Sequence, residues 1–112
     1  KVMNVIGDVK DQTCIIVDDI IDSGGTIVNA AKALKERGAK EVYVYITHGV
    51  LSGDAVKKIK SSVIKNLVIT DTIDNTNKIK NVKNIEVLPI SGLMGEAIKR
   101  ISNSTSVSDL FK

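Results

Sequence analysis

Four short apolar runs alternate with segments of helical spacing, and this alternation constrains the fold more than any other feature of the sequence. The runs are rich in β-branched residues and almost continuously apolar, which is typical of strands buried on both faces of a parallel sheet. Parallel strands need crossover connections, and right-handed crossovers through helices are the common form. The runs lie at residues 13–17, 42–47, 67–70 and 85–88.

Three segments between and after these runs place apolar residues three and four positions apart, as on one face of a helix. Gly38 is expected to end the first helix, and Ser52 or Asp54 is available to cap the second. Residues 71–84 are polar and without a clear period, so we expect a surface connection there. The helical apolar positions are Ile27, Ala30, Ala31 and Leu34, then Ala55, Val56 and Ile59, and finally Leu93, Ala97, Ile98 and Ile101.

The order of these elements predicts an α/β fold with a doubly wound, mainly parallel sheet flanked by helices. The length of 112 residues is that of one domain and is sufficient for a hydrophobic core. Because the first residue is not an initiating Met, we expect a fragment of a longer protein.

The composition argues against membrane and nucleic-acid functions. No apolar run approaches the roughly 20 residues of a membrane span, and residues 1–10 do not resemble a signal peptide. The net charge of +3 is weak evidence for nucleic acid, because only 3% of the residues are aromatic and able to stack on bases. Cys14 is the single cysteine, so we expect it in the core of a protein from a reducing cytoplasm.

Residues 22–26, with the sequence DSGGT, carry the clearest chemical signal. Gly24 and Gly25 let the backbone approach an anion closely, and the unpaired N–H groups of the following helical turn would point at it. The hydroxyls of Ser23 and Thr26 add donors. This loop is therefore predicted to hold a phosphate group.

Three acids, Asp18, Asp19 and Asp22, stand beside this loop. The first two directly follow an expected strand, and ligands of open α/β sheets bind beyond the carboxyl ends of the strands. Carboxylates repel phosphate, so they suit the hydroxyls of a sugar or a divalent cation bound with it. The stretch predicts a phosphorylated sugar. The structural alternative is that Asp22 or Ser23 caps the helix and the glycines form a tight turn, which a glycine pair alone would favour.

The sequence of residues 17–27, VDDIIDSGGTI, resembles the phosphoribosyl-diphosphate-binding motif of the type I phosphoribosyltransferase fold. A longer similarity is to the C-terminal part of the ribose-phosphate pyrophosphokinases, also called phosphoribosyl pyrophosphate synthetases. It covers essentially the whole chain and is carried, in order, by residues 2–26, 33–53, 68–73 and 106–111.

The resemblance implies transfer of the diphosphoryl group of ATP, with Mg²⁺, to the C1 hydroxyl of ribose 5-phosphate. It places the 5-phosphate at residues 22–26, and the ribose hydroxyls with their cation at Asp18 and Asp19. Ser23-Gly24-Gly25 departs mildly from the Thr-Ala/Cys-Gly frequent in the family.

Family members are about twice as long or more, with two similar domains. The resemblance therefore implies that residues 1–112 are a C-terminal ribose 5-phosphate-binding domain, with no catalytic residue of its own and no activity alone. The ATP-binding parts and the mobile basic loop would precede Lys1.

Several residues outside this loop have more than one possible role. His48 follows an expected strand near the binding edge, where a metal or acid–base role and a structural role both stay open. Gly49 and Gly53 are expected in turns. By resemblance, the tail lies at a subunit interface of a hexamer and binds a regulatory phosphate or ADP; the plain alternative is a frayed terminus. The regulatory candidates are Ser106, Ser108 and Phe111.

Two other functions share the loop. A phosphoribosyltransferase that consumes the activated sugar should lack the motifs THGVLSG and SVSDLF, both of which are present. A non-catalytic homologue that binds a phosphorylated ligand and regulates active subunits would differ in the upstream sequence.

Overall fold

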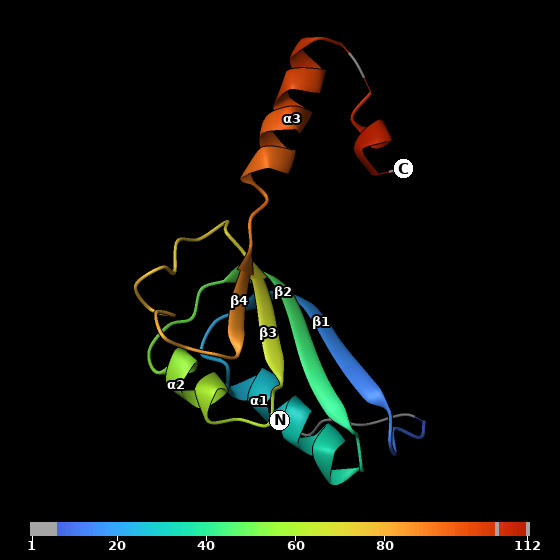
Figure 1. Cartoon of the computed structure of the whole chain (residues 1–112), viewed down its shortest axis with the longest axis vertical. Coiled ribbons are helices and arrows are strands. Elements are labelled where there is room, and N and C mark those ends of the chain that lie inside the picture. The colour runs from blue at the N-terminus through green and yellow to red at the C-terminus, as the bar shows by residue number, and fades with distance from the viewer. Residues whose placement is uncertain (1–6, 105, 112) are drawn as a thin grey trace.

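The protein, described here from a computed structural model, forms a four-stranded sheet with the strand order β1-β2-β3-β4, in which all neighbours are parallel (Figure 1). The described residues are 7–104 and 106–111; residues 2–6 of the family motif, residue 105 and the Phe111 side chain lie outside them. The elements are β1 (Thr13–Ile21), α1 (Gly25–Glu36), β2 (Glu41–Gly49), α2 (Ala55–Lys60), β3 (Asn66–Thr70), β4 (Ile85–Leu88), α3 (Ser91–Ser102) and the 3-10 helix η1 (Ser108–Phe111).

The α/β class, with a parallel sheet and flanking helices, is confirmed, and every expected strand and helix is present. The first strand is longer than expected. Parallel pairing continues past residue 17, with Asp18 beside Ile46 and Ile21 beside Gly49, so Asp18 and Asp19 lie inside β1 rather than after it. This is possible because backbone groups alone make the pairing, and both carboxylates remain exposed to solvent.

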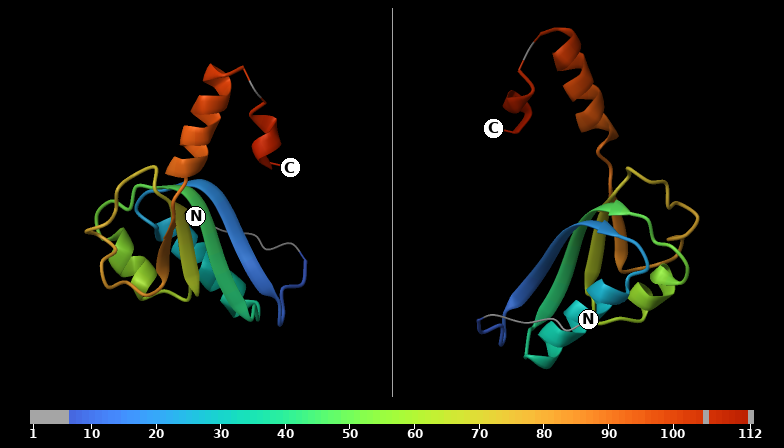
Figure 2. Two further views of the ribbon diagram at one scale, coloured as in Figure 1. Left: turned by 45° about the horizontal axis from the view of Figure 1, so that its top comes forward. Right: turned by 180° about the vertical axis from the view of Figure 1, so that it is seen from behind.

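The core lies between one face of the sheet and the helices α1 and α2, which lie side by side on that face (Figure 2). Cys14 packs against this core, as expected. Gly38 follows α1 with a φ of 93°, a value that favours glycine at a helix end. The buried residues that meet in this core include Ile27, Ala31, Val42, Val44, Ile46, Ala55, Ile59, Leu67, Ile69 and Ile85.

The opposite face of the sheet is open in the described part of the chain. Val17 is 74% exposed, Ile15 54% and Tyr45 44%, so the expectation that the strands are buried on both faces is wrong here. An apolar sequence pattern shows that a face can be covered, but not what covers it. A depression of about 430 Å³ on this face is lined by Val17, Asp18, Tyr45, Ile46, Thr47, Val68, Ile69, Thr70 and Leu88.

The helix α3 projects away from the sheet, and none of its residues is buried (Figure 1). The radius of gyration is 16.5 Å, compared with about 13 Å for a compact 100-residue domain. None of the helices in residues 7–104 and 106–111 combines the length and apolar character needed to cross a bilayer.

The connection between β3 and β4 runs over the surface as expected, and it also forms hydrogen bonds with the end of β2 and the segment after it. The buried Asn75 donates from Nδ2 to the Gly49 carbonyl at 2.7 Å. The Lys78 ammonium donates to the carbonyls of Val50 at 3.1 Å and Leu51 at 3.3 Å. These contacts hold residues 49–51 at the carboxyl edge of the sheet.

Leu67 is fully buried in β3, so Leu67→Ala should lower the free energy of unfolding by about 2–5 kcal/mol. The control Lys32→Ala, at an exposed position of α1, should change it by no more than about 0.5 kcal/mol. Urea denaturation measures both. Equal effects of the two substitutions would contradict this description of the core.

Candidate functional site

The candidate site is the junction between β1 and α1, where residues 22–24 connect Ile21 to Gly25. Gly24 precedes the helix with a φ of 85°, and no side chain caps the helix by a hydrogen bond. The structural alternative, in which Asp22 or Ser23 serves as the cap, is therefore not what the structure has. The turn is made by the backbone of Gly24, which is buried.

Three N–H groups at the start of α1 are open. Val28 donates to the Gly24 carbonyl at 3.0 Å, but the N–H groups of Gly25, Thr26 and Ile27 make no hydrogen bond within residues 7–104 and 106–111. Such groups carry the positive end of the helix dipole. They can therefore bind an anion without breaking an existing interaction.

The two glycines differ in their surroundings. A Cβ atom on Gly24 would lie 3.7 Å from the Ala55 Cβ, an ordinary contact, so its positive φ is the main constraint. A Cβ atom on Gly25 would meet nothing within 4 Å. The space beside Gly25 is open to a ligand.

A pocket of about 250 Å³ opens at this junction. It brings together most of the residues that the sequence predicts, and Asp18 lines both this pocket and the depression on the open sheet face. Asp19 and Gly25 do not line it; the Asp19 N–H donates to Asp18 Oδ1 at 2.8 Å. The lining residues are Asp18, Ile20, Ile21, Asp22, Ser23, Gly24, Thr26 and Ile27.

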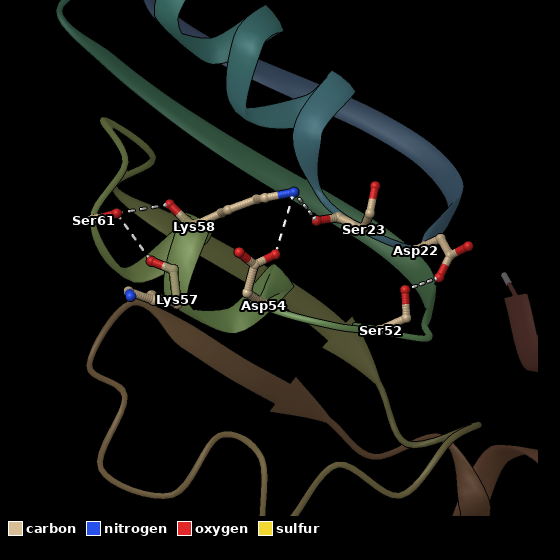
Figure 3. Close-up of polar contacts among 7 residues, drawn as sticks. All are labelled: Asp22, Ser23, Ser52, Asp54, Lys57, Lys58 and Ser61. Atoms are coloured by element: carbon tan, nitrogen blue, oxygen red, sulfur yellow. Dashed lines mark hydrogen bonds and ion pairs between the residues drawn. The ribbon is translucent and has the colours of Figure 1, made fainter.

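Two polar residues that sequence reasoning did not assign to the site contact this loop (Figure 3). Ser52 donates from its hydroxyl to Asp22 Oδ1 at 2.5 Å, and Lys58 donates from Nζ to the Ser23 carbonyl at 3.5 Å. The sequence suggested Ser52 or Asp54 as the cap of α2, and the capping position is Asp54. The motif THGVLSG, which contains Ser52, also resembles a family loop near the active site. No local pattern links residues 22 and 52, because their contact depends on the sheet.

His48 lies near the carboxyl ends of β2 and β3, but it is not among the residues that line the pocket. Its Nδ1 lies 2.8 Å from the Thr72 hydroxyl oxygen. Gly53 has a φ of 56°, as expected of a turn residue. Gly49 instead ends β2, where an added Cβ would come within 2.8 Å of Ile69 Cδ1.

The tail lies beside α3 (Figures 1 and 2). Arg100 Nη1 donates to the Ser106 carbonyl at 3.0 Å, and the hydroxyl oxygens of Ser106 and Ser108 are 2.8 Å apart. The backbone of Phe111 ends η1. The described part of the tail contributes no residue to the pocket at the β1–α1 junction.

These features define an α/β domain in which the turn between β1 and α1 leaves N–H groups open at the start of the helix. The family model of the phosphoribosyl synthetase-associated domain matches residues 1–112, and the chain belongs to this family. The resemblance seen in the sequence is thereby confirmed.

The chain is also similar to curated proteins named ribose-phosphate pyrophosphokinase. The ribose-phosphate pyrophosphokinase of Hyphomonas neptunium is 60% identical over 111 residues, 99% of this chain and 36% of the relative. That of Buchnera aphidicola is 53% identical over 112 residues, 100% of this chain and 36% of the relative. A crystal structure of phosphoribosylpyrophosphate synthetase from Mycobacterium smegmatis has a TM-score of 0.83 and 38% identity, covering 88% of this chain and 33% of that one. The chain thus spans about a third of the length of these proteins.

The turn makes a testable prediction about its two glycines. Because Gly24 has a positive φ, Gly24→Ala should lower the free energy of unfolding by about 1–2 kcal/mol. Gly25→Ala, at a helical position with free space, should leave it unchanged or raise it by about 0.4–1 kcal/mol. Thermal or urea unfolding of the two variants checks this, and a larger loss in Gly25→Ala would contradict the turn geometry.

Proposed function

We propose that the protein containing this chain is a ribose-phosphate diphosphokinase, which converts ATP and ribose 5-phosphate to phosphoribosyl diphosphate and AMP. In this proposal, residues 1–112 are its C-terminal domain and supply the ribose 5-phosphate site. The observation that carries the proposal is the set of open N–H groups on Gly25, Thr26 and Ile27 at the start of α1. They lie beside a pocket whose lining includes Asp18 and Asp22. The named relatives support it.

The loop separates two kinds of ligand chemistry. The 5-phosphate would accept hydrogen bonds from the three amides and from the hydroxyls of Ser23 and Thr26. Charge repulsion keeps the phosphate away from the carboxylates, which can accept hydrogen bonds from sugar hydroxyls. A sugar phosphate satisfies both sets at once, whereas inorganic phosphate satisfies only the first.

We propose Mg²⁺ as the cofactor, held near Asp18 and Asp19 together with the ribose hydroxyls. Among residues 7–104 and 106–111, no group of three or more His, Cys, Asp or Glu side chains could hold a metal ion. Two carboxylates are nevertheless a donor set that suits Mg²⁺, which usually keeps several waters and ligand oxygens in its shell. The cation would neutralise negative charge on the transferring diphosphoryl group.

The remaining parts of the reaction belong to the part of the protein outside this chain. ATP binding and the groups that stabilise the transferring charge would come from there, so this chain alone should position the acceptor sugar without turnover. We further propose a cytoplasmic homo-oligomer, a hexamer, regulated by phosphate or ADP at Ser106, Ser108 and Phe111.

The proposal predicts how ribose 5-phosphate binds. Heteronuclear NMR titration should shift the amide signals of Gly25, Thr26 and Ile27, and Thr26→Val should weaken binding about tenfold, because one hydrogen bond to a charged group is lost. The matched control Thr13→Val, at the exposed start of β1, should bind like the wild type. Equal affinity of both variants, or ribose binding as tightly as ribose 5-phosphate, would contradict the assignment of the phosphate.

A further inference from the structure

The segment after β2 packs directly on the candidate loop (Figure 3). Ser52 contacts Asp22 twice: its hydroxyl donates to Asp22 Oδ1 at 2.5 Å, and its N–H donates to the Asp22 carbonyl at 3.0 Å. The N–H groups of Val50 and Leu51 both donate to the carbonyl of Ile21. The backbone and the carboxylate of Asp22 are therefore held by one neighbouring segment.

Two further contacts continue this interface along α2. Ala55 is fully buried beside Gly24: a Cβ atom added to Gly24 would lie 3.7 Å from the Ala55 Cβ. Lys58 Nζ lies 3.5 Å from the Ser23 carbonyl and 3.4 Å from Asp54 Oδ1. These contacts involve the backbone of the loop, whereas the Ser52 hydroxyl contacts a side chain, the Asp22 carboxylate.

We infer that Ser52 is a positioning residue that orients the Asp22 carboxylate toward the sugar part of the ligand; this inference rests on the proposed function. The Ser52 hydroxyl occupies Oδ1, whereas Oδ2 has no hydrogen bond within the described residues. A carboxylate accepts hydrogen bonds and cannot donate them. A ligand group that forms a hydrogen bond with Oδ2 must therefore be a donor, such as a hydroxyl, and not a phosphate oxygen.

The inference predicts different effects on the binding of inorganic phosphate and of ribose 5-phosphate. Binding of inorganic phosphate depends on the amides at the start of α1, so it should not depend on how Asp22 is oriented. Binding of ribose 5-phosphate uses Asp22 as well, and it should weaken when Ser52 no longer fixes the carboxylate. A general loss of loop structure would instead weaken both ligands together.

The test is an NMR titration of the protein with ribose 5-phosphate and, separately, inorganic phosphate. Ser52→Ala should weaken the binding of ribose 5-phosphate about tenfold, because a hydrogen bond to a charged group is lost. The affinity for inorganic phosphate should stay unchanged. Ser52→Thr, which keeps the hydroxyl, should restore the affinity. Ser61→Ala is the matched control, since the Ser61 hydroxyl donates to the carbonyls of Lys57 and Lys58 and to no residue of the candidate loop in the described part of the chain.

A double-mutant cycle decides whether Ser52 acts through Asp22. In an Asp22→Ala background, which removes the acceptor of the Ser52 hydroxyl, Ser52→Ala should have no further effect on ribose 5-phosphate binding. An unchanged affinity in Ser52→Ala, an equal loss for both ligands, or the same loss in both backgrounds would overturn the inference. A failure of the proposed function would give a different result: the amide signals of the wild-type loop would shift with neither ligand. That result would contradict both the proposed function and the role of Ser52.

Discussion

The parallel pairing of β1 with β2 is the interaction on which the rest of the site depends. It aligns Ile21 with Gly49, so that both strands end at the same edge of the sheet. The turn at residues 22–24 and the segment that begins at Val50 therefore leave that edge together and bind each other. The helix α1 can then start with open N–H groups, because its preceding turn is held by a neighbour rather than by a capping side chain.

Much of this arrangement could be predicted from the sequence. The β-branched runs identify all four strands, and the glycine pair before an amphipathic segment identifies the turn. The end of β1 was missed because Asp18 and Asp19 interrupt the apolar run, although an edge strand tolerates exposed carboxylates while its backbone stays paired. Burial on both faces was wrongly expected, because apolar residues such as Val17 do not reveal which segment covers them.

The contacts that organise the site could not be predicted in the same way. Ser52 and Asp22 are 30 positions apart in the sequence, and Asn75 and Gly49 are 26 apart. Each pair meets only because the register of the sheet brings two loops to one edge. The register of strand pairing cannot be predicted from a local sequence pattern. The sequence therefore predicts the groups expected to touch a ligand, but not the residues that contact those groups from the neighbouring segment.

The central claim is that the first amides of α1 hold the phosphate of a sugar whose hydroxyls face the acids of β1 and its turn. A crystal structure of the protein with ribose 5-phosphate tests it most directly. The account predicts phosphate oxygens within about 2.7–3.2 Å of the nitrogens of Gly25, Thr26 and Ile27, with sugar hydroxyls toward Asp18 and Asp22. A sugar phosphate bound elsewhere, or bound with its phosphate away from these amides, would contradict it.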